Sequence, residues 1–272
     1  MSGAIRSAAF FKVRDGRTLV PLWLEPEGST FVVFREAAAG GDNLIYATRN
    51  AEVIVPAREW VQGGAVPIQV TVGRGDEVTA RLSQPGRYEF GFAKGGTQVI
   101  DVPQISSPVE IGGPWEVQLQ PGRGAPEKIV LERLMDLSEH ASEGVRYFSG
   151  TATYLTTFTV PPRLIGEAQG LSLDLGNVQV MARVQLNGQD LGVLWKVPYR
   201  LDITSAARPG ENALEVTVAN LWLNRLIGDR SLPPERRVAW TTWNPFTDDS
   251  PLPQSGLLGP VTLQVEEIRR VR

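Results

Sequence analysis

The densest group of side chains able to hold a polar ligand lies in the segment NLWLNRLIGD, from Asn220 to Asp229. Asparagines, an arginine and an aspartate alternate there with leucines, an isoleucine and a tryptophan. Amide, guanidinium and carboxylate groups form directional hydrogen bonds, whereas tryptophan offers a broad apolar face. This mixture predicts either a ligand site or a network that holds a long loop. Arg225 and Asp229 also have the spacing of a local ion pair.

Aromatic residues gather in the last third of the chain, many of them beside proline, asparagine or aspartate. Sugars present apolar ring faces and hydroxyl groups, so aromatic side chains next to polar ones suit them. A single tryptophan is more often a core residue, but the loop WTTWNPF is broken by a proline and is harder to bury. The predicted carbohydrate-binding residues are Trp195, Tyr199, Trp222, Asn224, Arg225, Asp229 and Trp243.

Carboxylates offer two further kinds of chemistry, metal binding and glycoside hydrolysis. Asp248 and Asp249 are the best candidates for a hard cation such as calcium, which takes carboxylate and carbonyl oxygens. A capped turn before Pro251 explains the same two residues. Hydrolysis needs a pair of carboxyl groups roughly 5 to 9.5 Å apart, and the 30 acidic residues do not reveal such a pair. If the chain is catalytic by itself, we expect Asp229, Asp248 or Asp249 to act.

The composition argues against several other classes of protein. Without cysteine there are no disulfides and no thiolate chemistry. The single histidine, His140, lies in a polar stretch, where we expect a surface or capping role. The net charge of −3 argues against a nucleic-acid or anionic-membrane partner. We find no signal peptide and no apolar run of about 20 residues, the length of a membrane span.

The RGD tripeptide, Arg74–Asp76, matches a hairpin turn.

Short strands bounded by glycine, proline, aspartate or asparagine are predicted along the whole chain. The first half, including TLVPLWLEP and STFVVFRE, predicts an antiparallel β-sandwich. The segment ISSPVEIGG indicates a domain boundary, so we expect domains at residues 1–107 and 108–272. In the second domain TATYLTTFTV alternates as a half-buried strand does, and Asn187-Gly188 predicts a type I′ hairpin. KIVLERL fits a strand or a short helix.

A series of motifs in the second domain occurs in a recognisable order: LDLG, LNG, PYRLDIT, PGEN and a strand that ends in AN. This order resembles the galactose-binding-like jelly roll of family 2 glycoside hydrolases. Further motifs make the chain resemble, more closely, the C-terminal region of the family-106 α-L-rhamnosidases. They are GPWEVQ at Gly113–Gln118, RYFSGTATY at Arg146–Tyr154, NRLIGD at Asn224–Asp229 and SGLLGPVTL at Ser255–Leu263.

The resemblance implies an all-β chain in which an antiparallel β-sandwich precedes a galactose-binding-like jelly roll. That family hydrolyses terminal α-L-rhamnose with carboxylates and a calcium ion on a (β/α)₈ barrel, which takes about 250 residues of alternating strand and helix. These 272 β-rich residues cannot form one. We therefore expect a carbohydrate-binding accessory region of a rhamnosidase-like hydrolase, with a secreted or periplasmic parent.

The expected partners are a rhamnose- or galactose-containing glycan and a catalytic barrel domain, with calcium as a possible cofactor. Two other hypotheses stay open. The chain is a glycoside hydrolase in its own right, acting through loop carboxylates, or it is a structural docking or oligomerisation module.

Overall fold

The computed structural model describes residues 6–24, 28–35, 41–56, 68–73 and 77–271. Strands hold 45% of these described residues and helices 8%, which confirms the predicted all-β fold. The Arg74–Asp76 tripeptide lies outside the described residues. The chain divides into two compact units, and each is described by itself.

The first unit consists of Met1–Ser107 together with two later segments, Gly166–Gly170 and Val265–Arg272. Its main sheet has the antiparallel order β4-β3-β7-β8. In a second sheet β6 pairs on one side with β5 and on the other with Glu267 to Arg270 of β20. The strands are β1 (Lys12–Arg14), β2 (Arg17–Leu19), β3 (Leu44–Arg49), β4 (Glu52–Val55), β5 (Ile68–Val72), β6 (Val78–Leu82), β7 (Gly86–Phe92), β8 (Thr97–Val102) and β20 (Thr262–Arg270).

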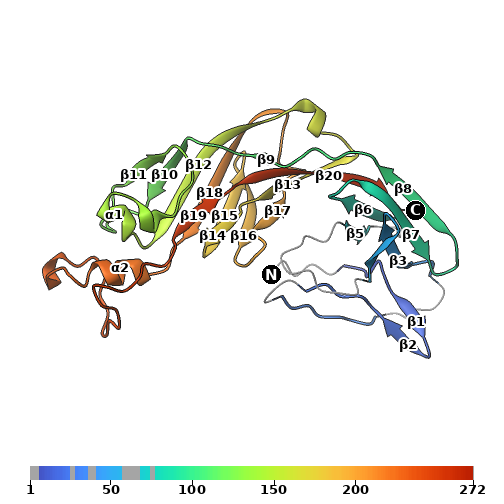
Figure 1. Cartoon of the computed structure of the whole chain (residues 1–272), viewed down its shortest axis with the longest axis horizontal. Helices are drawn as coiled ribbons and strands as arrows, with labels where there is room; N and C mark the ends of the chain where they lie inside the picture. The colour runs from blue at the N-terminus through green and yellow to red at the C-terminus, as the bar shows by residue number, and fades with distance from the viewer. Residues whose placement is uncertain (1–5, 25–27, 36–40, 57–67, 74–76, 272) are drawn as a thin grey trace. The chain divides into compact units, whose positions relative to one another are not determined.

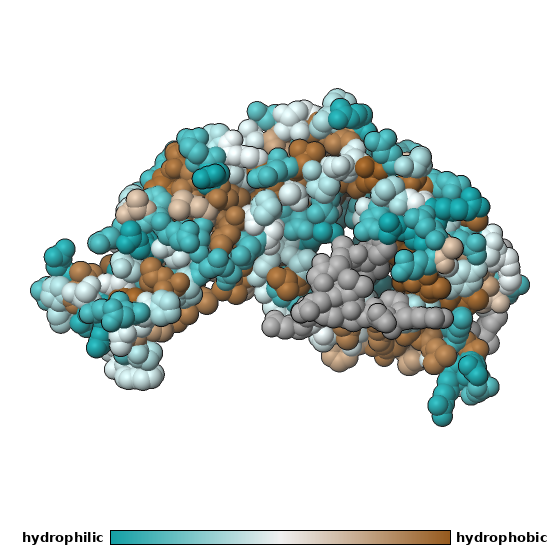
Figure 2. Space-filling view, in the orientation of Figure 1, coloured by the Kyte–Doolittle hydropathy of each residue, from teal (hydrophilic) through white to brown (hydrophobic). Residues whose placement is uncertain are grey.

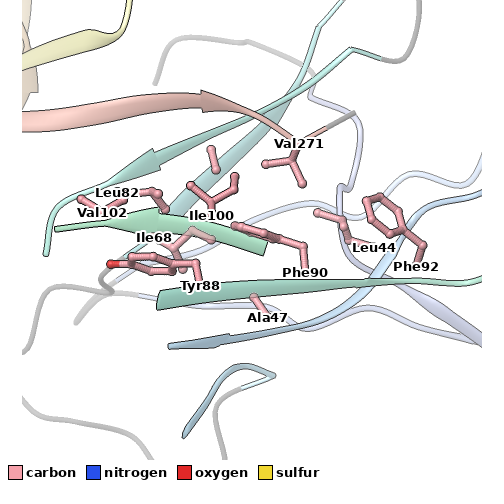
Figure 3. Close-up of a cluster of buried hydrophobic side chains, with 11 residues drawn as sticks. Leu44, Ala47, Ile68, Leu82, Tyr88, Phe90, Phe92, Ile100, Val102 and Val271 are labelled. Carbon is pink, nitrogen blue, oxygen red and sulfur yellow. The ribbon is translucent and has the colours of Figure 1, made fainter. Parts of the chain in front are cut away.

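A cluster of buried apolar side chains forms the core of this unit (Figure 3). Tyr88 and Phe90 are fully buried on β7, because alternate residues of a strand face the same side. The hydroxyl of Tyr88 donates to the carbonyl of Gln84 at 2.7 Å, so its polar end is satisfied. Val271, which follows β20, is also fully buried in this cluster. The core of the first unit therefore uses a residue from near the end of the sequence.

Two of the strands predicted in the first half are largely absent from the structure. Of TLVPLWLEP only the first residues belong to a strand, β2, and residues 28–35 of the STFVVFRE region form none. Phe31 in that region is 93% exposed. A β-prone sequence forms a strand only where a neighbouring strand supplies hydrogen bonds and packing. Within the described residues, this segment has no such neighbour.

The second unit consists of Pro108–Ile165 and Leu171–Gln264. Its larger sheet has the order β11-β10-β12-β18-β15-β16 (Figure 1). The two central strands, β12 and β18, pair along their whole length, from Thr151 opposite Ala219 to Val160 opposite Gly210. The strands of this sheet are β10 (Trp115–Leu119), β11 (Lys128–Leu131), β12 (Thr151–Val160), β15 (Met181–Leu186), β16 (Gln189–Leu194) and β18 (Gly210–Ala219).

Shorter strands and single helical turns complete the second unit. The strands are β9 (Val109–Glu110), β13 (Gln169–Asp174), β14 (Asn177–Gln179), β17 (Arg200–Asp202) and β19 (Gly256–Gly259), of which β13 begins in the first unit. The helical turns are η2 (Leu137–Glu139), α1 (Glu143–Arg146), η3 (Pro162–Leu164), α2 (Leu223–Gly228) and η4 (Pro234–Arg236).

Several local predictions for this unit are confirmed. Asn187 and Gly188 have φ angles of 53° and 79°, the positive values that a type I′ turn requires between β15 and β16. Along β12, Tyr154 is buried and Thr157 is exposed, as the alternation of TATYLTTFTV predicts. KIVLERL contributes the strand β11.

Candidate functional site

The polar segment Asn220–Asp229 opens the long connection between β18 and β19 in the second unit. β18 ends at Ala219, α2 spans Leu223–Gly228, and β19 begins at Gly256. Figure 1 shows α2 and the chain after it extending away from the ends of β18 and β19. A connection of this length needs partners for its backbone groups and anchors for its shape. Buried side chains of the polar segment supply both.

Asp229 ties two parts of the connection together. Its Oδ1 lies 3.0 Å from Nη2 of Arg225, and both side chains are buried. Its Oδ2 accepts the backbone N–H groups of Val238 at 3.0 Å and Ala239 at 2.7 Å. A carboxylate that accepts backbone N–H groups forms charge-assisted hydrogen bonds, which are stronger than neutral ones. Asp229 therefore fixes the backbone at residues 238 and 239 against the end of α2.

Arg225 is held on a second side by an aromatic ring. Its guanidinium carbon lies 5.8 Å from the ring centroid of Tyr147, within the range of a cation–π contact. The packing around this pair needs glycine, because a Cβ on Gly228 would lie 2.4 Å from Cγ of Tyr147. A Cβ on Gly124 would lie 2.9 Å from a methyl group of Val238. The glycine of the NRLIGD motif is thus explained by packing.

The far end of the connection is anchored by hydrogen bonds between side chains and the backbone of residues 253, 255 and 256. Asn224 donates from Nδ2 to the carbonyl of Pro253 at 2.8 Å. The N–H of Ser255 donates to Oδ1 of Asp136 at 3.0 Å, and the N–H of Gly256 donates to Oδ1 of Asn220 at 2.6 Å. Two of these buried side chains belong to the polar segment and Asp136 comes from an earlier part of the chain, and together they fix residues 253–256.

Asp136 is a residue that the sequence analysis missed. It is distant in sequence from Ser255, and its surroundings, LERLMDLSEH, carry no motif that marks it. The only local signal is the sequence DLS, because Asp136 also accepts the N–H of Ser138 at 2.9 Å as the N-cap of η2. A capping aspartate is a common local feature, so its role in the connection could not be predicted.

Several of the predicted carbohydrate-binding residues lie inside the protein. Asn224, Arg225 and Asp229 are buried and engaged in the contacts described above. Tyr199 is also buried, and its hydroxyl donates to the carbonyl of Val180 at 2.7 Å, so its ring offers no open face. Of the two roles considered for the polar segment, these contacts support the network that holds the loop.

The tryptophans of the same connection are exposed. Trp222 is 54% exposed and Trp243 is 74% exposed, and Trp240, which was not among the predicted residues, is 79% exposed. The backbone near Trp243 is tied down, because Asn244 donates from Nδ2 to the carbonyl of Leu226 at 2.8 Å. Figure 2 shows hydrophobic and hydrophilic residues interleaved over the region of α2 and this connection. Large aromatic side chains on an anchored backbone are suited to contact a ligand.

Trp195 lies at the end of the sheet from which the connection leaves. In the antiparallel register Leu194, the last residue of β16, is opposite Ala182 of β15, which directly follows Met181, and Trp195 comes directly after Leu194. Met181 pairs on its other side with Ala219, the last residue of β18. Trp195 is 49% exposed, and neighbouring strands lie about 4.8 Å apart. The structure thus brings Trp195 near the point where the chain leaves β18.

Asp248 and Asp249 are exposed and belong to a turn. The N–H of Ser250 donates to the carbonyl of Thr247 at 3.1 Å, and the N–H of Thr247 donates to Oγ of Ser250 at 2.9 Å. In the part of the chain that the structure describes, no three histidine, aspartate or glutamate side chains gather in a way that could hold a metal ion. Calcium takes six to eight oxygen ligands, and this pair does not fit that requirement.

His140 makes a local contact. Its Nδ1 accepts the N–H of Ser142 at 3.1 Å, a capping contact of the kind that the sequence predicted. Among the described residues, no helix combines the length and the apolar character that crossing a membrane requires.

Comparison with known proteins identifies the second unit. Residues 130–244 match the family described as the glycosyl hydrolase 2 galactose-binding domain-like family. A putative beta-glucuronidase of Formosa agariphila is 37% identical over 204 residues, which cover 66% of this chain and 18% of that protein. The structure of a rhamnosidase from Novosphingobium sp. PP1Y matches with a TM-score of 0.55 and 32% identity, over 75% of this chain and 24% of that one.

These matches confirm the predicted resemblance. The chain contains a galactose-binding-like domain of the glycosyl hydrolase 2 type, and it resembles part of a rhamnosidase. It spans less than a quarter of the length of each of these two relatives.

Proposed function

We propose that this chain is a carbohydrate-binding accessory region of a glycoside hydrolase. In this proposal the exposed tryptophans of the connection between β18 and β19, together with Trp195, are the surface that contacts the glycan. The family match over residues 130–244 and the likeness to part of a rhamnosidase support the assignment to a hydrolase. A catalytic barrel domain would act on the bound glycan, in a secreted or periplasmic parent protein.

The exposed Trp240 and Trp243 on a fixed backbone are the observation that carries this proposal. Asp229 holds the two residues before Trp240, and Asn244, the residue after Trp243, is held by its hydrogen bond to Leu226. A surface that is ordered before binding loses less conformational entropy when the ligand arrives. The ring faces would cover the apolar side of a sugar, and backbone and side-chain polar groups nearby would bind its hydroxyls.

The sugar is expected to be rhamnose or galactose within an oligosaccharide. The likeness to a putative beta-glucuronidase adds glucuronic acid as a third sugar to test.

Isothermal titration calorimetry with oligosaccharides of these sugars tests the proposal. We expect binding with the native chain and a loss of at least about tenfold in affinity, or about 1.4 kcal/mol, for Trp240→Ala and Trp243→Ala. Phe31→Ala is the matched control, because Phe31 is an exposed aromatic residue of the first unit. Absence of heat with every sugar at millimolar concentration would contradict the proposal.

A docking role is the second candidate, and a specific observation favours it. The described part of the first unit exposes large apolar side chains close together in sequence: Leu19, Leu22, Trp23, Leu24, Phe31, Val32, Val33 and Phe34. Figure 2 shows a hydrophobic surface beside β1 and β2. Large exposed apolar patches mark interaction surfaces. Light scattering of the native chain and of the double variant Phe31→Ser/Phe34→Ser tests this docking role. We expect the double variant to self-associate more weakly than the native chain.

Hydrolysis by the chain alone is the least supported function. Both oxygens of Asp229 are engaged inside the protein, which leaves the exposed Asp248 and Asp249 among the candidates. Release of nitrophenol from nitrophenyl glycosides by the purified chain, lost in Asp248→Asn/Asp249→Asn, would establish activity.

A further inference from the structure

Arginines accompany the exposed tryptophans in the connection between β18 and β19. Arg230, Arg236 and Arg237 are exposed, and within the described residues none of them has an acidic side chain at ion-pair distance. Arg225, by contrast, is neutralised by Asp229 inside the protein. The segment from Arg230 to Trp243 contains one acidic residue, Glu235, and so carries a net charge of +2 in a chain whose net charge is −3.

The contacts of Asp229 bring two of these arginines toward one of the tryptophans. Arg230 directly follows Asp229, whose Oδ2 holds the N–H groups of Val238 and Ala239. Arg237 and Trp240 are the residues on either side of that pair. With about 3.8 Å between consecutive Cα atoms, the backbones of Arg230, Arg237 and Trp240 lie within roughly 15 Å of one another.

Arg237 has a further contact that limits its movement. Its Nε donates to the carbonyl of Leu232 at 3.0 Å. This hydrogen bond uses one donor of the guanidinium group and leaves the Nη nitrogens for other partners. The result is a cation with a fixed side chain three residues before the exposed Trp240.

We infer that this segment recognises an anionic sugar, with its acidic group on Arg230 and Arg237 and its ring against Trp240. The inference rests on the proposed carbohydrate-binding function and specifies the class of ligand. Guanidinium groups match the geometry of carboxylate and sulfate oxygens and bind them through paired hydrogen bonds. A uronate or a sulfate ester supplies such oxygens, and a neutral rhamnose or galactose residue does not.

Calorimetry at two salt concentrations tests the inference. The ligands are an oligogalacturonate, a sulfated galactan oligosaccharide and a neutral galacto-oligosaccharide of equal length. We expect at least one anionic ligand to bind about tenfold more tightly than the neutral one at low salt, where charges on a surface are weakly screened. The preference should shrink at about 0.15 M salt. The first two ligands show whether the carboxylate or the sulfate is preferred.

Charge variants assign the effect to the named residues. Arg230→Gln/Arg237→Gln should lose the preference for the anionic ligand and keep the neutral binding, and Arg237→Lys should lose part of it, since lysine keeps the charge without the paired donors. Arg133→Gln/Arg163→Gln, which changes two exposed arginines elsewhere in the second unit, is the matched control and should keep the preference. Far-UV circular dichroism and the melting temperature show that each variant is folded.

The possible outcomes separate this inference from the proposed function. Equal binding of neutral and anionic ligands, independent of salt, would overturn the inference and leave carbohydrate binding intact. A preference that survives in Arg230→Gln/Arg237→Gln would overturn the assignment to these residues. Absence of binding to all three ligands and to rhamnose-containing oligosaccharides would overturn the proposed function, and the inference with it.

Discussion

Arg225 and Asp229 form a buried ion pair at the end of α2, with Nη2 and Oδ1 3.0 Å apart and side-chain exposures of 7% and 4%. Removing two charges from water is costly, and the pair recovers this cost only where further hydrogen bonds satisfy its other atoms. Oδ2 of Asp229 meets that condition through the N–H groups of Val238 and Ala239, whereas Nε of Arg225 has no hydrogen-bond partner among the described residues. The pair therefore joins the stability of the second unit to the shape of its exposed loop.

Asp229→Asn is expected to destabilise the second unit strongly. The substitution leaves Arg225 buried without its counter-charge, and breaking a buried pair in this way costs about 3 to 5 kcal/mol. Urea denaturation followed by tryptophan fluorescence measures the change in the free energy of unfolding. The control is Asp190→Asn, which breaks the exposed pair of Asp190 with Arg183 and should change stability little. Equal effects in the two variants would show that burial of the pair does not matter.

Asn224→Ala is expected to loosen the connection between β18 and β19. Loss of the hydrogen bond to Pro253 should cost about 1 to 3 kcal/mol, since it leaves a partly buried carbonyl without its partner. Trypsin should then cleave faster after Arg230, Arg236 or Arg237. Asn177→Ala is the control, because Asn177 is exposed and its side chain makes only exposed hydrogen bonds in the described residues, with Gln254 at 3.4 Å and Gln179 at 3.1 Å. Unchanged cleavage sites and rates would show that Asn224 does not anchor the loop.

Gly256→Ala is expected to be more harmful than Gly188→Ala. Both glycines have positive φ angles, 92° and 79°, so alanine strains the backbone at either position by about 1 to 2 kcal/mol. At Gly256 the new Cβ would in addition lie 2.4 Å from the hydroxyl oxygen of Tyr154, whereas at Gly188 it meets open space. The difference between the two losses in unfolding free energy therefore measures packing alone. Similar losses would mean that the packing around Gly256 adjusts easily.

Tyr154→Phe is expected to change how stability depends on alkaline pH. Burial raises the pKa of Tyr154 above the ordinary value of 10.0, because the charged form is poorly solvated there. Above pH 10 the unfolded chain loses this proton while the folded chain keeps it, so stability falls as the pH rises. The native chain should lose about 1.4 kcal/mol more per pH unit than the variant in that range.

The same variant should also be less stable at neutral pH. The hydroxyl of Tyr154 accepts the N–H of Leu257 at 3.1 Å, and phenylalanine leaves that buried N–H without a partner. Denaturation curves recorded from pH 8 to about pH 11.5 separate the two effects. Parallel curves for the native chain and the variant would contradict the proposed effect of burial on the pKa.

Local features of the fold could be predicted because the sequence marks them directly. The Asn187-Gly188 hairpin follows from the positive φ angles that these residues tolerate. The strand β12 follows from the alternation of apolar and polar residues. The β-prone residues 29–35 were predicted wrongly, since a strand also needs a neighbour, and the sequence of one segment does not say whether it has one.

The site was less predictable for the same reason. That the polar residues of NLWLNRLIGD hold a loop depends on partners far along the chain, such as Gly256 for Asn220. The burial of Tyr199 depends on its contact with Val180, which its own surroundings, KVPYRLD, do not indicate. Exposed tryptophans in the loop WTTWNPF could be predicted, because a proline-broken segment seldom buries its own aromatic rings.

The pairing of β6 with the last residues of β20 has a consequence for the way the chain is made. Most of the first unit precedes the second unit in the sequence, yet the buried Val271 of its core follows the second unit. Contacts between residues so distant in sequence form slowly, since the intervening chain must first be brought into place. During synthesis the first unit must therefore wait with an open sheet edge at β6, and we expect it to depend on chaperones until β20 has been made.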